Sequence, residues 1–398
     1  MSTPNRVVVL SASVNRLSRH TVTLDPSSLS LSHTHTHKHL SIYIYVFSLI
    51  DNFGVDQELV DVDVPVMAKQ WWEETKFYME NIVRKEERYD EVKESCQNMH
   101  KLCTAWAADE RCESPDDKAY METNCAPACR KCHLLIFEER CPWDPDAIDD
   151  AWQPGDLDKM FTRITTEPYY VNKYRPEILS KPVEDNEVDA GGMEDGPWMV
   201  LLNDFLTEEE CKRLIELGGI EGYELSKDIG DRNADGTYGD KQSKYRTSTN
   251  AWCTETCYKD DATQAVVARM ENVTGIPDAY SEYFQLLRYE VGQFYGKHHD
   301  YSEHVKERQE GVRILTVFFY LNDVEEGGGT DFPQVGVTVM PKRGSALLWP
   351  STLDEAPHEV DSRTEHQALP VEKGVKYGCN AWVHIRDFKT PYGNGCAT

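Results

Sequence analysis

The segment 289–301 carries the residue types with the clearest potential for chemistry. It contains His298-His299-Asp300, so that an imidazole and a carboxylate are two residues apart. Side chains two apart on a strand share a face, which would bring His298 and Asp300 together. They are two of the three ligand types in the facial triad by which non-haem Fe(II) oxygenases hold iron and leave coordination positions open. Because His-x-Asp pairs are common by chance, a third ligand must come from a later strand.

Two later histidines, His358 and His366, compete for the third position. The residue pattern alone does not choose between them. His299 lies between the two candidate ligands, so on a strand it should point to the opposite face. We therefore predict a structural role for His299.

The elements that must position these residues are short strands. Beyond Tyr280, apolar runs separated by turns predict strands at 284–291, 312–321, 335–340, 345–349 and 380–385. Such a series is typical of an antiparallel sandwich or barrel. Upstream, residues 198–202 form an apolar run, and Thr207 with Glu210 fits a capping box that opens a helix. The prediction is a mainly β domain with helices packed at its start.

Four ordered motifs in this half of the chain resemble the catalytic domain of prolyl 4-hydroxylases. They are residues 289–301, 313–328, 344–349 and 366–377, and in the last of them Lys376 follows His366 by ten residues. The resemblance spans about residues 195–390. It implies an α+β, mainly β fold, namely a double-stranded β-helix (jelly roll) with flanking helices. It also implies that His366 is the third ligand and that His358 is a loop histidine.

The same resemblance implies a role for each site residue. The expected Fe(II) ligands are His298, Asp300 and His366, and the expected catalytic set adds Lys376. Lys376 would pair with the distal carboxylate of the cosubstrate 2-oxoglutarate, because a buried charge needs an oppositely charged partner. Tyr289 and Thr330 match positions that hydrogen-bond this carboxylate. The implied reaction hydroxylates proline in a peptide or protein with O2 and 2-oxoglutarate, gives succinate and CO2, and uses ascorbate as a further cofactor.

Four more residues match positions that line the peptide groove in this family: Tyr295, Arg313, Trp382 and His384. Taken alone, Trp382 could equally belong to the core and Arg313 to the surface of a strand. The segment 228–248 is long, polar and rich in glycine and aspartate. Family members carry a mobile loop over the substrate at this position.

Six of the twelve cysteines lie between Cys96 and Cys132. A segment this short cannot bury enough apolar surface to fold without covalent or metal staples. Cys129 and Cys132 could form half of a zinc site, but six cysteines suit three disulfides better. The spacing resembles the ShK-toxin-like (ShKT) domain, which implies the pairs Cys96–Cys132, Cys103–Cys125 and Cys112–Cys129. The module is interpreted as a binding element or as a stabilising or targeting accessory, and Cys253–Cys257 as a local bridge.

The cysteine cluster also bears on the compartment. Disulfides persist in oxidising environments, and Asn272-Val273-Thr274 is a glycosylation sequon. Together they favour the endoplasmic reticulum lumen or the secretory pathway, although no signal peptide is recognisable. The net charge of −27 argues against nucleic acid as a partner. No run approaches the roughly 20 apolar residues of a membrane-spanning helix.

The chain is predicted to have five parts. They are an unreliable or disordered N-terminus (1–66), a helical lead-in (67–95), the ShKT module (96–132), a linker rich in proline and acidic residues (133–194) and the catalytic domain (195–392). The first contains alternating His/Thr at 32–39 and Ile/Tyr at 42–45. Such alternation is typical of non-coding repeat DNA that has been translated, and it indicates that the start of the protein is assigned too far upstream. The alternative is that the histidines form a metal-binding tract.

Two other functions are kept beside proline hydroxylation. One is the same chemistry on another residue, such as lysine. The other is a catalytically inactive oxygenase scaffold that serves as a secreted, disulfide-rich binding protein. The presence of His298, Asp300, His366 and Lys376 argues against the inactive scaffold, since such a protein has no chemical reason to keep all four.

Overall fold

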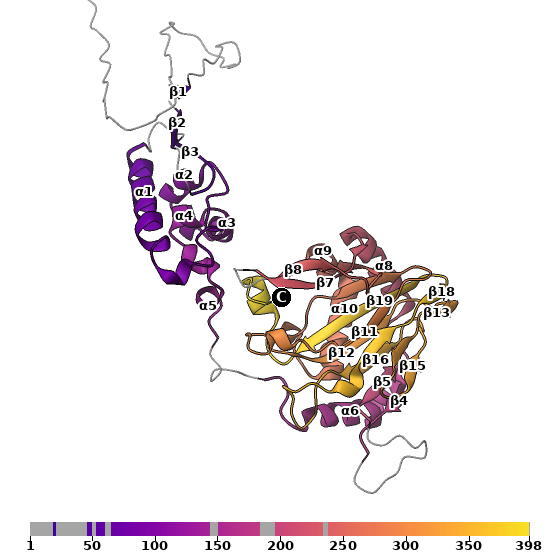
Figure 1. Cartoon of the computed structure of the whole chain (residues 1–398). Helices are drawn as coiled ribbons and strands as arrows, with labels where there is room; N and C mark the ends of the chain where they lie inside the picture. The colour runs from indigo at the N-terminus through magenta and orange to yellow at the C-terminus, as the bar shows by residue number, and fades with distance from the viewer. Residues whose placement is uncertain are drawn as a thin grey trace, which may run out of the picture. The chain divides into compact units, whose positions relative to one another are not determined.

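The chain divides after Arg140 into two units (Figure 1). The computed structural model describes residues 19–20, 46–49, 53–59, 65–143, 150–183, 196–233 and 238–397. Most of the N-terminal part predicted to be unreliable, including its His/Thr and Ile/Tyr repeats, therefore lies outside the described residues. Among the described residues, no helix has the length and apolar character needed to span a membrane.

A large antiparallel sheet runs through the second unit (Figure 1). Its strands, in order across the sheet, are β4 (Pro176–Ser180), β5 (Met199–Leu202), β16 (Ala346–Pro350), β12 (Arg313–Tyr320), β19 (Lys376–His384), β10 (Gln285–Tyr289), β9 (Thr249–Trp252) and β6 (Glu224–Leu225). A second sheet contains β11 (Tyr295–His298), β17 (His366–Ala368), β14 (Thr330–Phe332) and β15 (Val337–Val339). Two further pairs are β13 (Glu326–Gly327) with β18 (Val371–Lys373), and β7 (Lys227–Arg232) with β8 (Tyr238–Gln242).

One face of the large sheet packs against the second sheet. Alternate residues of β12, among them Phe318 and Tyr320, share a buried cluster with Phe332 of β14 and Trp349 of β16. Because side chains alternate along a strand, Val317 and Phe319 point the other way, into a separate core. The two sheets thus form the expected double-stranded β-helix, and the α+β fold is confirmed.

Helices cover the other face of the large sheet. These are α6 (Asp156–Thr166), α7 (Pro168–Tyr174), α8 (Glu208–Glu221) and α10 (Asp261–Thr274), whose apolar side chains share the core of Val317 and Phe319. The capping box that opens α8 is confirmed. The Thr207 hydroxyl accepts from the Glu210 amide at 3.1 Å, and the Glu210 carboxylate accepts from the Thr207 amide at 2.8 Å.

The segment predicted to be a poorly structured linker differs from that prediction. Residues 156–174 form α6 and α7, and β4 follows at the edge of the large sheet. Leu157, Phe161 and Ile164 recur at helical spacing and are buried, which outweighs the proline-rich composition. Pro168 begins α7 rather than interrupting it, because proline is tolerated in the first turn of a helix.

The first unit contains the disulfide module and an N-terminal helix. The helix α1 (Pro65–Tyr78) runs into a π-helical turn at Met79–Val83, so the regular helix is shorter than the predicted lead-in. Three short helices follow, namely α2 (Cys103–Ala108), α3 (Lys118–Asn124) and α4 (Ala126–Cys129). The disulfides in this unit are Cys96–Cys132, Cys103–Cys125 and Cys112–Cys129, the same pairs that the ShKT resemblance implies.

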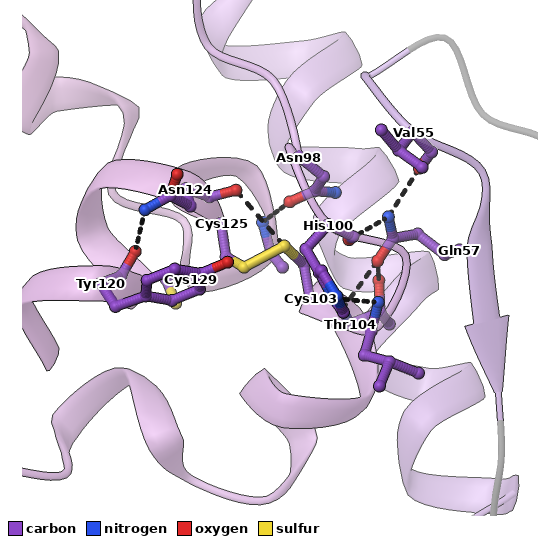
Figure 2. Close-up of a disulfide and its surroundings, with 12 residues drawn as sticks. Val55, Gln57, Asn98, His100, Cys103, Thr104, Tyr120, Asn124, Cys125 and Cys129 are labelled. Atoms are coloured by element: carbon purple, nitrogen blue, oxygen red, sulfur yellow. Dashed lines mark hydrogen bonds between the residues drawn. A yellow bond between two sulfur atoms is a disulfide. The ribbon is translucent and has the colours of Figure 1, made fainter. Parts of the chain in front are cut away.

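Residues 53–59 belong to this module, which corrects the predicted boundary of the unreliable N-terminus. Figure 2 shows Gln57, which is fully buried, between Val55, His100 and Thr104. Its amide oxygen accepts from the Thr104 amide at 2.9 Å and hydroxyl at 3.1 Å. Its amide nitrogen donates to the carbonyl oxygens of Val55 and His100. The three hydrogen bonds to His100 and Thr104 fix residues 53–59 to the disulfide module. The repeats at 32–39 and 42–45 led to the prediction that this segment is also unreliable.

Candidate active site

The predicted ligands come together at the pairing of β11 with β17. His298 ends β11 and lies opposite His366, the first residue of β17, while Asp300 follows β11 by two residues. One ligand atom from each residue lies within 4.8 Å of the others. The Asp300 carboxylate is 3.9 Å from His298 Nε2 and 3.7 Å from His366 Nε2. The three side chains therefore converge closely enough to bind one metal ion together.

Hydrogen bonds to backbone carbonyls fix the orientation and the tautomer of the two histidine rings. His298 Nδ1 lies 2.8 Å from the Gly296 carbonyl, and His366 Nδ1 lies 3.0 Å from the Thr364 carbonyl. Each Nδ1 must donate to its carbonyl, so each Nε2 keeps a free lone pair toward Asp300. Such backbone contacts set the tautomer of metal-binding histidines. The Thr316 hydroxyl donates to Asp300 Oδ2 at 2.7 Å and orients the carboxylate.

The protonation states also suit metal binding. Burial, assisted by His366, lowers the pKa of His298 to about 3, and burial lowers the pKa of His366 as well. Burial alone would raise the pKa of Asp300, but the two histidines and the Thr316 hydroxyl lower it to about 2. Near neutral pH the site therefore offers two neutral imidazoles and one carboxylate, which are the forms that bind metals.

The other histidines near the site are engaged elsewhere. His299 Nε2 lies 2.9 Å from the Asp361 carbonyl, and its Nδ1 accepts from the Tyr301 amide. His358 Nε2 contacts the Asp150 carboxylate at 2.8 Å. The structure thus places His366, and not His358, beside His298 and Asp300.

Lys376 lies on the inner face of the large sheet, beside Tyr289 on the neighbouring strand. Its side chain is 1% exposed, and Nζ has no hydrogen-bond partner among the described residues. Three rings surround the ammonium, those of Tyr289 and Phe318 at 5.3 Å and that of Tyr320 at 5.7 Å. Burial lowers its pKa to about 7. An unpaired buried cation is costly, so this environment fits a ligand with a carboxylate.

Thr330 lies beside the three rings that surround Lys376, and its hydroxyl oxygen accepts a hydrogen bond from the Tyr320 hydroxyl at 2.8 Å. Tyr289 is buried and forms one wall. The two residues predicted to bind the cosubstrate are therefore near Lys376 or linked to it through one aromatic neighbour. The donor set and the orphaned ammonium together fit Fe(II) and 2-oxoglutarate.

Comparison with known proteins identifies the family. A model of the 2OG-Fe(II) oxygenase superfamily matches residues 284–384, and an ShK domain-like model matches residues 95–132. Prolyl 4-hydroxylase 5 of Arabidopsis thaliana is 32% identical over 249 residues, which cover 55% of this chain and 82% of that protein. Probable prolyl 4-hydroxylase 10 of the same plant is 33% identical over 237 residues, with 54% and 78% covered. The chain belongs to the prolyl 4-hydroxylase family.

This prolyl 4-hydroxylase family member is accordingly an Fe(II)- and 2-oxoglutarate-dependent dioxygenase. Among solved structures, the viral collagen prolyl hydroxylase of Paramecium Bursaria Chlorella virus-1 in complex with 2OG is 23% identical. That likeness covers 47% of this chain and 95% of the viral protein, with a TM-score of 0.38.

The four residues predicted to line the peptide groove of this prolyl 4-hydroxylase fall into two groups. Tyr295 stacks on the His298 ring, with centroids 3.6 Å apart. Arg313, Trp382 and His384 lie together, and the Arg313 guanidinium is 4.0 Å from the Trp382 ring. Trp382 is 5% exposed and His384 only 1%, so in this structure His384 contacts protein rather than solvent.

Glu282 is a residue of this site that sequence reasoning missed. Its buried carboxylate accepts from Arg313 Nε and lies 2.9 Å from His384 Nε2. Burial opposes ionisation, but Arg313 and His384 lower the pKa of Glu282. Arg246 was also missed; its guanidinium lies over the Tyr295 ring at 4.7 Å and donates to Gln285. No short motif marks either residue, because both are brought to the site by strand pairing.

Proposed function

We propose that this dioxygenase hydroxylates proline in peptides or proteins. The observation that carries the proposal is the buried, unpartnered ammonium of Lys376 in the same unit as the three converging side chains of His298, Asp300 and His366. In the proposed reaction one oxygen atom of O2 enters a C–H bond of proline. The other enters succinate as 2-oxoglutarate loses CO2, so that no further reductant is needed for each turnover.

The residues of this chain have distinct tasks in the proposal. His298 and His366 supply Nε2 lone pairs and Asp300 a carboxylate to Fe(II), which supplies the oxidising chemistry when bound. Lys376 holds the distal carboxylate of 2-oxoglutarate, and Thr330 and Tyr289 contribute hydroxyl groups from the same pocket. The rings around Lys376 exclude water, which strengthens that ion pair because the local dielectric constant is low.

The peptide is proposed to lie beside Tyr295, Arg313 and Trp382. His384 is buried and would support this groove without touching the peptide. Support comes from the stack of Tyr295 on a ligand histidine, which puts its hydroxyl-bearing ring directly at the site. Arg313 lies on β12, and its charge helps to lower the pKa of Asp300, so the two side chains are close. Substrate contacts at these positions would therefore be close to the reacting atoms.

The proposed compartment is the endoplasmic reticulum lumen or another part of the secretory pathway. The described residues contain five disulfides, including Cys253–Cys257 and Cys141–Cys396 in the second unit. Such bonds persist in oxidising compartments. Asn272 is exposed near the end of α10, so its predicted glycosylation meets no steric obstacle at that residue.

The test is release of succinate from 2-oxoglutarate by the full chain, with Fe(II) and ascorbate, with and without a proline-rich peptide. We expect succinate release to rise with the peptide and proline to gain the mass of one oxygen atom. Hydroxylation of lysine instead of proline would reassign the substrate residue. Bound iron without turnover on any peptide would favour the inactive scaffold.

A further inference from the structure

His299 lies in the chain between two of the proposed metal ligands, His298 and Asp300, and the hydrogen bonds of its ring lead away from them. Its Nδ1 accepts from the Tyr301 amide at 2.9 Å. A neutral imidazole has one donor and one acceptor, so Nε2 carries the proton. This Nε2 donates to the Asp361 carbonyl at 2.9 Å. The orientation and the tautomer of the His299 ring are therefore both fixed by the backbone.

The turn that His299 contacts leads directly to the third proposed ligand. Asp361 precedes a single helical turn, Ser362–Thr364, and β17 begins two residues later at His366. The Thr364 side chain is buried, and its hydroxyl lies 3.0 Å from His299 Nε2 and donates to the Asp361 carbonyl at 3.0 Å. The Thr364 carbonyl in turn accepts from His366 Nδ1 at 3.0 Å. Thr364 therefore connects the ring of His299 to the ring of His366.

This contact joins two segments that are far apart in the sequence. His299 is bonded through the backbone to both His298 and Asp300, and through its ring to the turn that carries His366. The pairing of β11 with β17 is short, and its register shifts before His298. Asp300 lies beyond the end of β11 and Thr364 precedes β17, so the contact through His299 extends the connection past the paired strands.

We propose that His299 is a positioning residue, which sets the separation between His298, Asp300 and His366 before a metal ion binds. The inference rests on the proposed function in one respect, namely that these three residues bind Fe(II). Residues that orient metal ligands commonly change metal affinity by about 10- to 100-fold when they are replaced. Without the link through His299, part of the free energy of metal binding would be used to bring the ligands together, so the affinity would fall.

The test replaces His299 in the full chain in three ways. His299→Phe keeps a ring without nitrogen atoms. His299→Gln places an amide nitrogen near the position of Nε2, where it can donate to the turn, whereas His299→Asn can accept from the Tyr301 amide but is too short to reach the turn. Titration of the metal-free chain with Mn(II), followed by electron paramagnetic resonance of the free ion, should show a Kd raised by about 10- to 100-fold in the Phe and Asn variants. His299→Gln should restore most of the affinity. The matched control is His358→Phe, which loses only a contact with Asp150 among the side-chain bonds described above and should leave the Kd unchanged.

A second variant tests the route through Thr364. Thr364→Val removes the hydroxyl but keeps the carbonyl that His366 contacts, so it should also raise the Kd for Mn(II). Its effect and that of His299→Phe should not add in the double variant, because both changes break the same link. Additive effects would overturn the proposal, and so would equal losses of affinity in His299→Gln and His299→Asn.

Thermal unfolding separates positioning from a merely structural role. If the His299 variants unfold at lower temperature but bind Mn(II) as tightly as the unmodified chain while they are folded, the proposal is overturned. Mn(II) binding requires neither a peptide nor turnover, so the result does not depend on which residue is hydroxylated. If His366→Ala binds Mn(II) normally, the proposed ligand set fails, and the proposal for His299 fails with it.

Discussion

His298 and His366 face each other across the pairing of β11 with β17, and their ring centroids lie 4.2 Å apart. The register shifts between Tyr295, which pairs with Ala368, and His298. Without that bulge, the residue opposite His366 would be Lys297. Bulges occur beside active sites because they redirect a side chain, and here the bulge brings two imidazoles to one metal position.

The first prediction concerns His366→Ala. Loss of one imidazole from a three-residue site should lower metal affinity and turnover by more than about 100-fold, since disturbing even a supporting residue costs 10- to 100-fold. Mn(II) titration and succinate release measure the two effects, and circular dichroism checks the fold. His358→Ala is the matched control, because that histidine pairs with Asp150 outside the site. Normal metal binding by His366→Ala would reassign the third ligand.

The second prediction follows from the ammonium of Lys376, whose pKa burial lowers to about 7. Above that pH the folded protein loses the proton, so the KM for 2-oxoglutarate should rise with pH, by at most about tenfold per unit. The unfolded chain keeps this proton up to the ordinary pKa of lysine. Stability contributed by this group should therefore rise with pH between the two values.

Lys376→Met tests the assignment, because methionine fills the space between the three rings without a charge. We expect a higher KM for 2-oxoglutarate that no longer depends on pH through this window. Calorimetry in two buffers should detect proton uptake when 2-oxoglutarate binds to the unmodified protein near pH 8, and none in the variant. A KM that is flat with pH in both proteins would contradict the role of Lys376.

Much of this site was accessible from sequence because its key residues fall in short motifs with fixed spacing. His298 and Asp300 are examples, and the resemblance to prolyl 4-hydroxylases adds His366 and Lys376. Glu282 and Arg246 were not accessible, because their roles arise from strand pairing between distant segments. The linker was misread for a different reason. Its composition is proline-rich, but three apolar residues at helical spacing decide its structure once a sheet is present to cover them.

The third prediction concerns Glu282, which joins Arg313 to His384. Glu282→Ala leaves a buried arginine without its carboxylate and should lower the free energy of unfolding by about 3 kcal/mol. Glu282→Gln keeps the shape and should chiefly raise the KM of the peptide, with the KM for 2-oxoglutarate unchanged. Glu290→Ala, which breaks the exposed pair with Arg288, should cost less than about 1 kcal/mol. If the two alanine variants lower the free energy of unfolding equally, Glu282 does not hold Arg313 and His384 in place.

The fourth prediction concerns Gln57 and the true extent of the disulfide module. Gln57→Ala leaves the buried amide and hydroxyl of Thr104 without their acceptor, a loss of about 1–3 kcal/mol. Hydrogen exchange followed by mass spectrometry should show faster exchange of the Thr104 amide, because Gln57 is its hydrogen-bond partner.

Gln97→Ala serves as the matched control for Gln57. Gln97 is an exposed glutamine of the same unit whose side chain donates to the nearby Glu94 carbonyl, so its loss should leave exchange at Thr104 unchanged. A chain that begins at residue 67 should exchange as fast as Gln57→Ala, since it lacks residues 53–59 altogether. Equal protection of Thr104 in all three proteins would mean that residues 53–59 do not stabilise the module, and the boundary predicted from sequence, between residues 66 and 67, would stand.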